Sequence, residues 1–224
     1  MSNSRLTRRL VQLFAGLILY GVSMAFMIES GLGLDPWDVF HQGLSKVTGL
    51  SFGLVVILVG VPVLLIWIPL RQRPGVGTLA NLVVIGVVVD RALALLPAGG
   101  AMPVRIGYLV GGIVLNAIAT ALYIGSRLGP GPRDGLMTGF VGRFPKLSVR
   151  LVRTAIEVTV LGAGFLLGGT VGVGTVAYAF GIGPLVQLFL PILTVAEPPR
   201  VERDRAPAGP VTQVGDHPDT FASR

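Results

Sequence analysis

The side chains best placed to bind a small solute lie in a short aspartate–proline motif. Asp35 precedes Pro36, and Asp38 follows three positions after Asp35. This spacing is typical of a helix start, with aspartate as the cap, proline at the first helical position and a second carboxylate facing the positive end of the helix. Such a start presents backbone N–H groups that can hold an anionic or polar solute. It can equally be a structural cap without a ligand, so both interpretations stay open.

A second copy of the motif lies 96 positions further along the chain. Pro132 and Asp134 again occupy the first and third helical positions, while Gly131 takes the place of the capping aspartate. Arg133 adds a positive charge beside this predicted helix start. We therefore treat the residues of both motifs as candidates for a substrate or pore site.

Two further polar residues occur within apolar segments. Glu157 follows Arg153 by one helical turn, so it can pair with that arginine, or it can couple a proton or bind a solute. Asn116 lies near the middle of another segment, where an amide can hydrogen-bond across helices or contact a substrate. Both residues complete the set of candidate pore residues.

The sequence offers no catalytic or metal-binding constellation. It contains no cysteine and two histidines, which excludes disulfides and thiol chemistry and leaves too few ligands for a Cys/His metal site. No Ser/His or paired-carboxylate arrangement appears in the sequence. We therefore expect no enzyme activity, no catalytic residue, no bound metal and no cofactor.

Both motifs belong to an internal duplication that covers most of the chain. Matching residues recur at a spacing of 96 positions in the first part of each copy and of 97 positions in the second part. The matched pairs include Gly16/Gly112, Ala25/Ala121, Ser30/Ser126, Gly33/Gly129, Gly43/Gly139, Gly75/Gly172, Thr78/Thr175 and Gly86/Gly183. If each copy holds three membrane spans, the two copies insert in opposite orientations, as in many transporters.

The composition places the chain in a lipid bilayer. Hydrophobic residues make up 52% of the chain and charged residues 13%, and the mean hydropathy is +0.76, which is too apolar for a soluble domain. Six segments are long and apolar enough to cross about 30 Å of hydrocarbon. They are residues 10–28, 52–70, 78–96, 106–125, 151–168 and 173–195. The predicted fold is an all-α, polytopic transmembrane helical bundle of two inverted repeats with three spans each.

Each repeat also holds a short helical segment that does not cross the bilayer. Residues 36–47 and 132–143 would each cover about 18 Å at 1.5 Å per residue, which is roughly half a bilayer. Two placements stay open for these segments. They are half-helices that re-enter the protein from opposite faces, or amphipathic helices that lie flat at the two membrane interfaces.

Lysine and arginine mark every second connection around the predicted spans. Basic residues precede the first span, separate the second from the third, and separate the fourth from the fifth. Because positively charged connections tend to stay in the cytoplasm, both termini are predicted to be cytoplasmic. The net charge of +7 therefore needs no nucleic-acid partner to explain it.

The predicted organisation of the chain follows from these segments. Residues 1–9 form a cytoplasmic N-terminus, 10–97 the first transmembrane repeat, 104–195 the second repeat, and 196–224 a disordered cytoplasmic tail rich in proline and charge. Small residues four positions apart recur in the spans, namely Gly107/Gly111, Ala117/Ala121, Gly164/Gly168 and Ala177/Gly181. Such pairs predict close helix packing, either within the protein or across a homodimer.

Three motifs resemble those of a known family. They are GLGLDPWDV at residues 31–39, RPGVGT at 73–78 and LGPGPRDGL at 128–136. Together they are similar to the bacterial YczE/YyaS/YitT family of multi-pass membrane proteins, in particular its YczE branch, over residues 8 to about 195. The resemblance implies a bacterial inner-membrane protein and supplies no established activity from which site residues could be transferred. The soluble C-terminal domain typical of the YitT branch is not evident in the sequence.

The sequence as a whole predicts a permease- or channel-like transporter of a small polar or anionic solute, with the lipid bilayer as its surroundings. The opposed repeats and the paired helix starts support this hypothesis. The alternative is a non-transporting membrane scaffold, or a regulatory or assembly partner. The packing glycines alone would suffice for that role.

Overall fold

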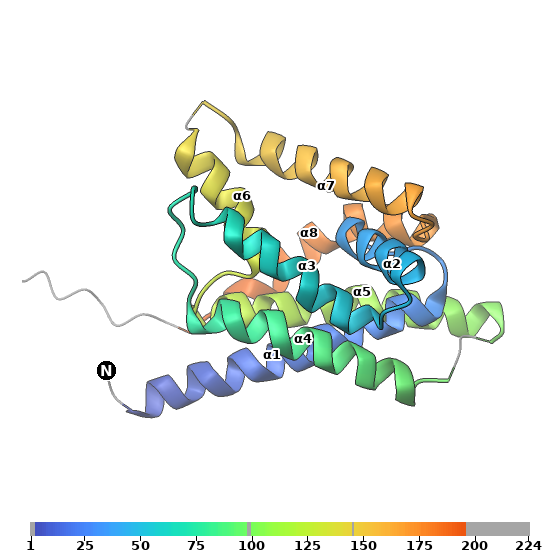
Figure 1. The fold of residues 1–224 in the computed structure, drawn as a ribbon. Helices are drawn as coiled ribbons and strands as arrows, with labels where there is room; N and C mark the ends of the chain where they lie inside the picture. The colour runs from blue at the N-terminus through green and yellow to red at the C-terminus, as the bar shows by residue number, and fades with distance from the viewer. Residues whose placement is uncertain (1–2, 98–99, 145, 196–224) are drawn as a thin grey trace, which may run out of the picture.

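The computed structural model describes residues 3–97, 100–144 and 146–195, which form eight α-helices and no strand (Figure 1). The helices are α1 (Asn3–Ser30), α2 (Pro36–Thr48), α3 (Phe52–Ile66), α4 (Val76–Leu95), α5 (Met102–Gly125), α6 (Pro132–Arg143), α7 (Val149–Leu166) and α8 (Val173–Leu193). The predicted all-α fold is thus confirmed. The predicted disordered tail at 196–224 lies outside the described residues.

Helices α1 and α5 form the centre of the bundle, where they lie side by side and run in opposite directions (Figure 1). Glycines at duplicated positions bring their backbones together. A Cβ atom on Gly16 would lie 2.8 Å from the backbone nitrogen of Tyr123, and one on Gly112 would lie 2.7 Å from Cγ of Met27. Close approach of this kind stabilises helix pairs in lipid. Helix α4 then packs on α1, and α8 packs on α5.

Among the described residues, four helices are long and apolar enough to cross a membrane, namely α1, α4, α5 and α8. Helix α3 has 15 residues, and α7 carries Arg150, Arg153 and Glu157, so neither qualifies on its own by length and composition. Helices α2 and α3 qualify together as a broken element bent by 112°, which raises the number of candidate spans to five. The six-span arrangement therefore stays a prediction.

The outer faces of α3 and α7 are nevertheless apolar. Large hydrophobic side chains are exposed along both helices, namely Leu54, Leu58, Val61 and Leu65 on α3 and Val158, Phe165 and Leu166 on α7. Monomeric soluble proteins rarely expose contiguous apolar surface of this extent. These faces are therefore suited to contact with lipid.

The two copies of the duplicated unit make the same contacts with exchanged partners. The backbone N–H of Gly77 donates to the Leu128 carbonyl at 2.9 Å, and that of Gly174 donates to the Leu32 carbonyl at 2.8 Å. The first bond joins the start of α4 to the loop before α6, and the second joins the start of α8 to the loop before α2. Each copy therefore holds the loop of the other copy in place.

The short helices α2 and α6 are also held by contacts between the two copies. In one contact the glycine lies on the short helix α6 and the large residue at the end of α3, and at the duplicated positions the glycine lies on the longer helix α7. Trp67, which ends α3, lies on Gly135 of α6, where an added Cβ would collide with the indole ring. At the duplicated positions, Gly164 of α7 lies against the backbone of Val39 in α2. Helix α6 is thus packed against α3 of the first copy, and α2 against α7 of the second copy. This packing fixes the position at which each short helix begins.

Candidate functional site

Helix α2 begins as the sequence predicts. Asp35 is the N-cap, and its Oδ1 atom accepts hydrogen bonds from the backbone N–H of Trp37 at 2.9 Å and of Asp38 at 3.1 Å. Pro36 occupies the first helical position. Asp35 and Asp38 are each only 1% exposed. A plain cap does not require two buried carboxylates, which are costly to remove from water.

Helix α6 begins at Pro132, after Gly131, which provides no side-chain cap. Asp134 in its first turn accepts a hydrogen bond from the hydroxyl of Tyr123 in α5. The indole N–H of Trp67 donates to the Pro132 carbonyl at 3.0 Å. Side chains from α3 and α5 thus fix this start in place of a capping aspartate.

The two helix starts face each other inside the bundle. A guanidinium nitrogen of Arg133 lies 3.6 Å from Oδ1 of Asp35, and the guanidinium carbon lies 5.5 Å from the centroid of the Tyr20 ring. Figure 1 shows α2 and α6 near opposite ends of α3. Helices lying flat at opposite interfaces would hold these starts about 30 Å apart. The contact therefore favours the re-entrant alternative over the interfacial one.

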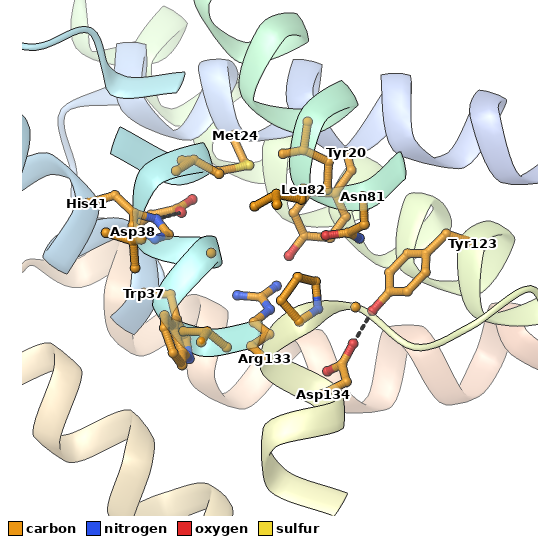
Figure 2. Close-up of a pocket in the computed structure, with 17 residues that line it drawn as sticks. Tyr20, Met24, Trp37, Asp38, His41, Asn81, Leu82, Tyr123, Arg133 and Asp134 are labelled. Carbon is orange, nitrogen blue, oxygen red and sulfur yellow. Dashed lines mark hydrogen bonds and ion pairs between the residues drawn. The ribbon is translucent and has the colours of Figure 1, made fainter. Parts of the chain in front are cut away.

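A first cavity of about 70 Å³ lies between the two helix starts and helices α1, α3 and α4 (Figure 2). Its polar side chains come from both copies, namely Tyr20, Asp38, His41, Asn81, Tyr123, Arg133 and Asp134. Figure 2 shows Asp38 and His41 on one side, Tyr123 and Asp134 on the other, and Arg133 between them. Most of the remaining wall is apolar.

Three residues that line this cavity have a buried polar atom without a hydrogen-bond partner among the described residues. These atoms are Oδ2 of Asp38, the hydroxyl of Tyr20 and the indole nitrogen of Trp37, whereas Oδ1 of Asp38 lies 3.2 Å from Nδ1 of His41. A buried polar group without a partner costs about 1–3 kcal/mol, and a charged group costs more. These groups are therefore suited to hydrogen bonds with a solute, Asp38 as an acceptor, Trp37 as a donor and the Tyr20 hydroxyl as either.

A second cavity of about 260 Å³ adjoins the same two helix starts. Trp37, Tyr123, Arg133 and Asp134 line both cavities, and Asp35 lines the second. The Asp35–Arg133 pair therefore belongs to the wall that the two cavities share.

The two cavities occupy equivalent places in the two copies. Several pairs of duplicated positions contribute one residue to each cavity, among them Met24 and Thr120, Val56 and Arg153, Gly60 and Glu157, Asn81 and Tyr178, and Ile85 and Ile182. Two uncharged positions of the first cavity thus carry an ion pair in the second, where Nε of Arg153 lies 2.9 Å from Oε1 of Glu157. The duplication therefore extends to the cavities themselves, and their chemistry has diverged.

The structure brings most of the sequence-predicted site residues together. The first cavity is lined by Asp38, Gly131, Pro132, Arg133 and Asp134, and the second by Asp35, Pro36, Arg133, Asp134 and Glu157. Asn116 lines neither cavity. Its Nδ2 donates to Oγ of Ser23 at 3.0 Å, and its Oδ1 accepts from the hydroxyl of Tyr178 at 3.0 Å. These bonds match the helix–helix interpretation of Asn116 and not the substrate interpretation.

Sequence reasoning missed Tyr20, His41, Asn81 and Tyr123 as site residues. His41 follows Asp38 by one helical turn, and this spacing could have identified the contact between them. Tyr20 and Tyr123 lie within long apolar helices, where a buried hydroxyl usually needs a partner. In the described ranges, no group of three or more His, Asp or Glu side chains could hold a metal ion.

The apolar helices, the buried charges between them and the apolar outer surface define an integral membrane protein with several helices. Comparison of sequences gives its family. The chain belongs to a family of unknown function, DUF6198, whose model matches residues 7–191.

Three relatives illustrate the family. An uncharacterized protein of Haemophilus influenzae is 42% identical over 183 residues, which cover 82% of this chain and 83% of the relative. The uncharacterized membrane protein YczE of Bacillus subtilis is 34% identical over 180 residues, or 80% and 83% of the two chains. The uncharacterized protein YyaS of the same organism is 28% identical over 183 residues, or 80% and 90%. The resemblance seen in the three motifs is thus confirmed. No solved structure matches the chain.

Proposed function

We propose that this protein is a permease- or channel-like transporter of a small polar solute across the bacterial inner membrane. The observation that carries the proposal is the contact between the starts of α2 and α6, beside two duplicated cavities. In many secondary transporters, broken helices whose ends meet near the membrane midplane form the substrate site between inverted repeats. Irregular backbone at that depth is tolerated where it lines a cavity.

Six spans in two inverted repeats are part of this proposal. Helices α2 and α3 together form a candidate broken span with a bend of 112°, and α6 with α7 is its duplicate. The apolar outer faces of α3 and α7 support a position in the bilayer. With six spans, both termini face the cytoplasm, in keeping with the arginine distribution.

The Asp35–Arg133 pair is the proposed gate between the two cavities. The pair lies in their shared wall together with Trp37 and Tyr123. The side chain of Arg133 is 28% exposed, whereas that of Asp35 is 1% exposed, so the arginine is the partner with room to move. Separation of the pair would join the cavities, and its re-formation would close them again.

Flux into proteoliposomes tests the proposal. Uptake of labelled amines, amino acids, small carboxylates and sugars is compared between liposomes with and without the purified protein. Transport predicts uptake above the protein-free level for at least one class, with loss of that uptake in Asp38→Asn and in Asp134→Asn. Failure of the folded wild-type protein to take up any of these solutes would contradict the proposal.

Asp90→Asn provides the matched control, because it makes the same change of charge outside both cavities. Asp90 holds the start of α3, where its carboxylate accepts from the Gly53 backbone N–H at 2.7 Å and from the Ser51 hydroxyl at 2.6 Å. Its substitution should leave flux unchanged in protein that is folded. A loss of flux equal to that of Asp38→Asn would show that removal of any such carboxylate impairs the protein.

A second candidate function is that of a non-transporting scaffold or assembly partner, which includes a homodimer. Gly107 on α5 and Gly162 on α7 are exposed, and a Cβ added at either position would meet no atom within 4 Å in the described chain. Small residues on outer helix faces allow close contact between helices of different chains in lipid. A stoichiometric partner after mild purification, combined with absence of flux, would favour this candidate over transport.

A further inference from the structure

We propose that the first cavity binds a small organic cation, a protonated amine of about the size of methylammonium. The inference deepens the proposed function and rests on it for the role of the bound amine, since it names the substrate class of the same site. It also narrows the anionic or polar solute expected from the helix starts to a cation. Charge, hydrogen bonding, size and comparison with the second cavity each support it.

The charges around the first cavity favour a cation. Asp38, Asp134 and Arg133 line it, and Arg133 already lies 3.6 Å from Asp35. Asp134 accepts a hydrogen bond from Tyr123, which leaves Asp38 as the lining carboxylate with an unpaired oxygen. An anion in the cavity would lie beside the Asp38 carboxylate, whereas a cation would compensate the charge of that group.

The backbone donors that would hold an anion at the start of α2 are already used. The N–H groups of Trp37 and Asp38 donate to the Asp35 carboxylate, and that of Val39 donates to the Asp35 carbonyl at 2.9 Å. Two side-chain atoms of this helix turn stay unpaired, the indole N–H of Trp37, which lies in the wall shared by both cavities, and an acceptor, Oδ2 of Asp38. Acceptors of this kind bind ammonium N–H groups through charge-assisted hydrogen bonds.

The unpaired atoms define the position of the ammonium group. An N–H of the ligand donates to Oδ2 of Asp38, and a second donates to the hydroxyl oxygen of Tyr20. Both residues are at least nine-tenths buried, and both atoms are without a partner in the described chain. Binding therefore satisfies two groups that otherwise carry a desolvation cost.

The size and the walls of the cavity select a small, alkylated ion. A cavity of about 150 Å³ holds benzene, so one of about 70 Å³ holds only a few heavy atoms. Met24 and Val56 supply apolar contacts for an alkyl group. Hard divalent cations take about six oxygen ligands, which is more than Asp38, Tyr20 and Asn81 provide. The cavity therefore matches a short amine better than a metal ion.

The second cavity does not offer an equivalent site. Its carboxylate from Glu157 already has a cation, because Nε of Arg153 lies 2.9 Å from it. Asp35 also has an unpaired oxygen there, but its other oxygen lies 3.6 Å from Arg133. Each of these carboxylates thus faces an arginine, whereas the nearest basic group to Asp38 is the imidazole of His41. We therefore assign the amine to the first cavity.

Calorimetric titration of methylammonium chloride into the full chain in lipid nanodiscs tests binding independently of flux. We expect saturable binding by the wild-type protein and roughly 30-fold or greater weakening in Asp38→Asn, because a buried charged hydrogen bond is lost. Asp90→Asn, with the same change of charge, should bind as the wild type does. Sodium chloride and sodium formate test a bare cation and an anion, and neither should bind or compete.

Tyr20→Phe tests the second contact of the ammonium group. It also keeps the binding test possible if Asp38→Asn does not fold. Loss of one hydrogen bond to the charged ammonium group should weaken methylammonium binding about 12- to 160-fold. Wild-type affinity in either folded variant would overturn the inference, as would binding of formate in place of methylammonium.

Flux measured on the same preparations separates this inference from the proposed function. Methylammonium binding that depends on Asp38 without uptake of any solute would support the amine site and contradict transport. Uptake of another solute without methylammonium binding would support transport and overturn the amine site.

Discussion

Replacement of Asp38 by asparagine should make the protein more stable while it removes ligand binding. Asp38 is 1% exposed, one of its carboxylate oxygens has no partner in the described chain, and the other lies 3.2 Å from Nδ1 of His41. A charge buried under these conditions opposes folding. A neutral side chain of the same shape relieves that cost, as often happens when a functional residue is replaced.

The expected gain is on the order of 1 kcal/mol. Removal of a poorly compensated buried charge returns several kcal/mol. Against this, the helix start loses a favourable charge worth about 0.3–1 kcal/mol. The bond to His41 weakens by about 1 kcal/mol when the acceptor becomes neutral, and the new amide N–H group lacks a partner at a cost of about 1–3 kcal/mol. A net gain of about 1 kcal/mol raises the thermal midpoint by about 2–4 °C in a chain of this length.

Thermal unfolding followed by circular dichroism in detergent measures this difference. Asp90→Asn is again the control, because the Asp90 carboxylate accepts two short hydrogen bonds at the start of α3. It should lower the free energy of unfolding by about 1–2 kcal/mol. A decrease in Asp38→Asn as large as the decrease in Asp90→Asn would show that both carboxylates stabilise the fold, and the argument for a functional charge would fail.

Three further changes test separate parts of the structure. Tyr20→Phe should raise the free energy of unfolding by about 1 kcal/mol, measured by thermal unfolding, because an unpaired buried hydroxyl is removed; a decrease would mean that the hydroxyl is paired. Gly135→Ala should destabilise the fold by about 1–3 kcal/mol because its Cβ collides with the indole ring of Trp67 at the end of α3. The control Gly142→Ala lies on the same helix, meets no atom within 4 Å in the described chain and should be neutral or stabilising. Equal effects of the two changes on chemical unfolding would contradict the packing. A double-mutant cycle of Asp35→Asn and Arg133→Gln should give a coupling energy of about 0.5–3 kcal/mol, and strictly additive stabilities would show that the pair does not interact.

The helix starts could be predicted from the sequence because their causes are local. A cap, a proline at the first helical position and a carboxylate in the first turn act within four residues of one another. The structure shows Asp35 and Pro36 in those roles. The duplication also predicted that the second start would resemble the first, and α6 begins at Pro132.

The contact between the two helix starts could not be predicted, because it depends on packing between distant segments. Trp67 lies on Gly135, and Gly164 lies at the duplicated position of Trp67. A tryptophan and a glycine at duplicated positions give no indication in the sequence that they hold equivalent helices. Periodicity alone likewise could not decide between the re-entrant and interfacial placements, since either one gives a helix with a single polar face.

The roles of single polar residues depended on the same distant contacts. Asn116 was a reasonable pore candidate by its position in an apolar span, yet Ser23 and Tyr178 occupy both ends of its amide. Tyr20, at the position duplicated by Asn116, has no partner for its hydroxyl and lines the first cavity. The spacing in the sequence could not distinguish the two, because the distinction comes from which helices pack around each residue.

The central claim is that the two copies present equivalent cavities toward opposite sides of the membrane. Single cysteines in place of His41 and of its duplicate Met137, which line the first and the second cavity, can be introduced without interference because the chain contains no other thiol. Labelling with a membrane-impermeant maleimide is then compared in right-side-out and inside-out vesicles. We expect each cysteine to be labelled from one side only, and the two sides to be opposite. Labelling of both cysteines from the same side would contradict the central claim.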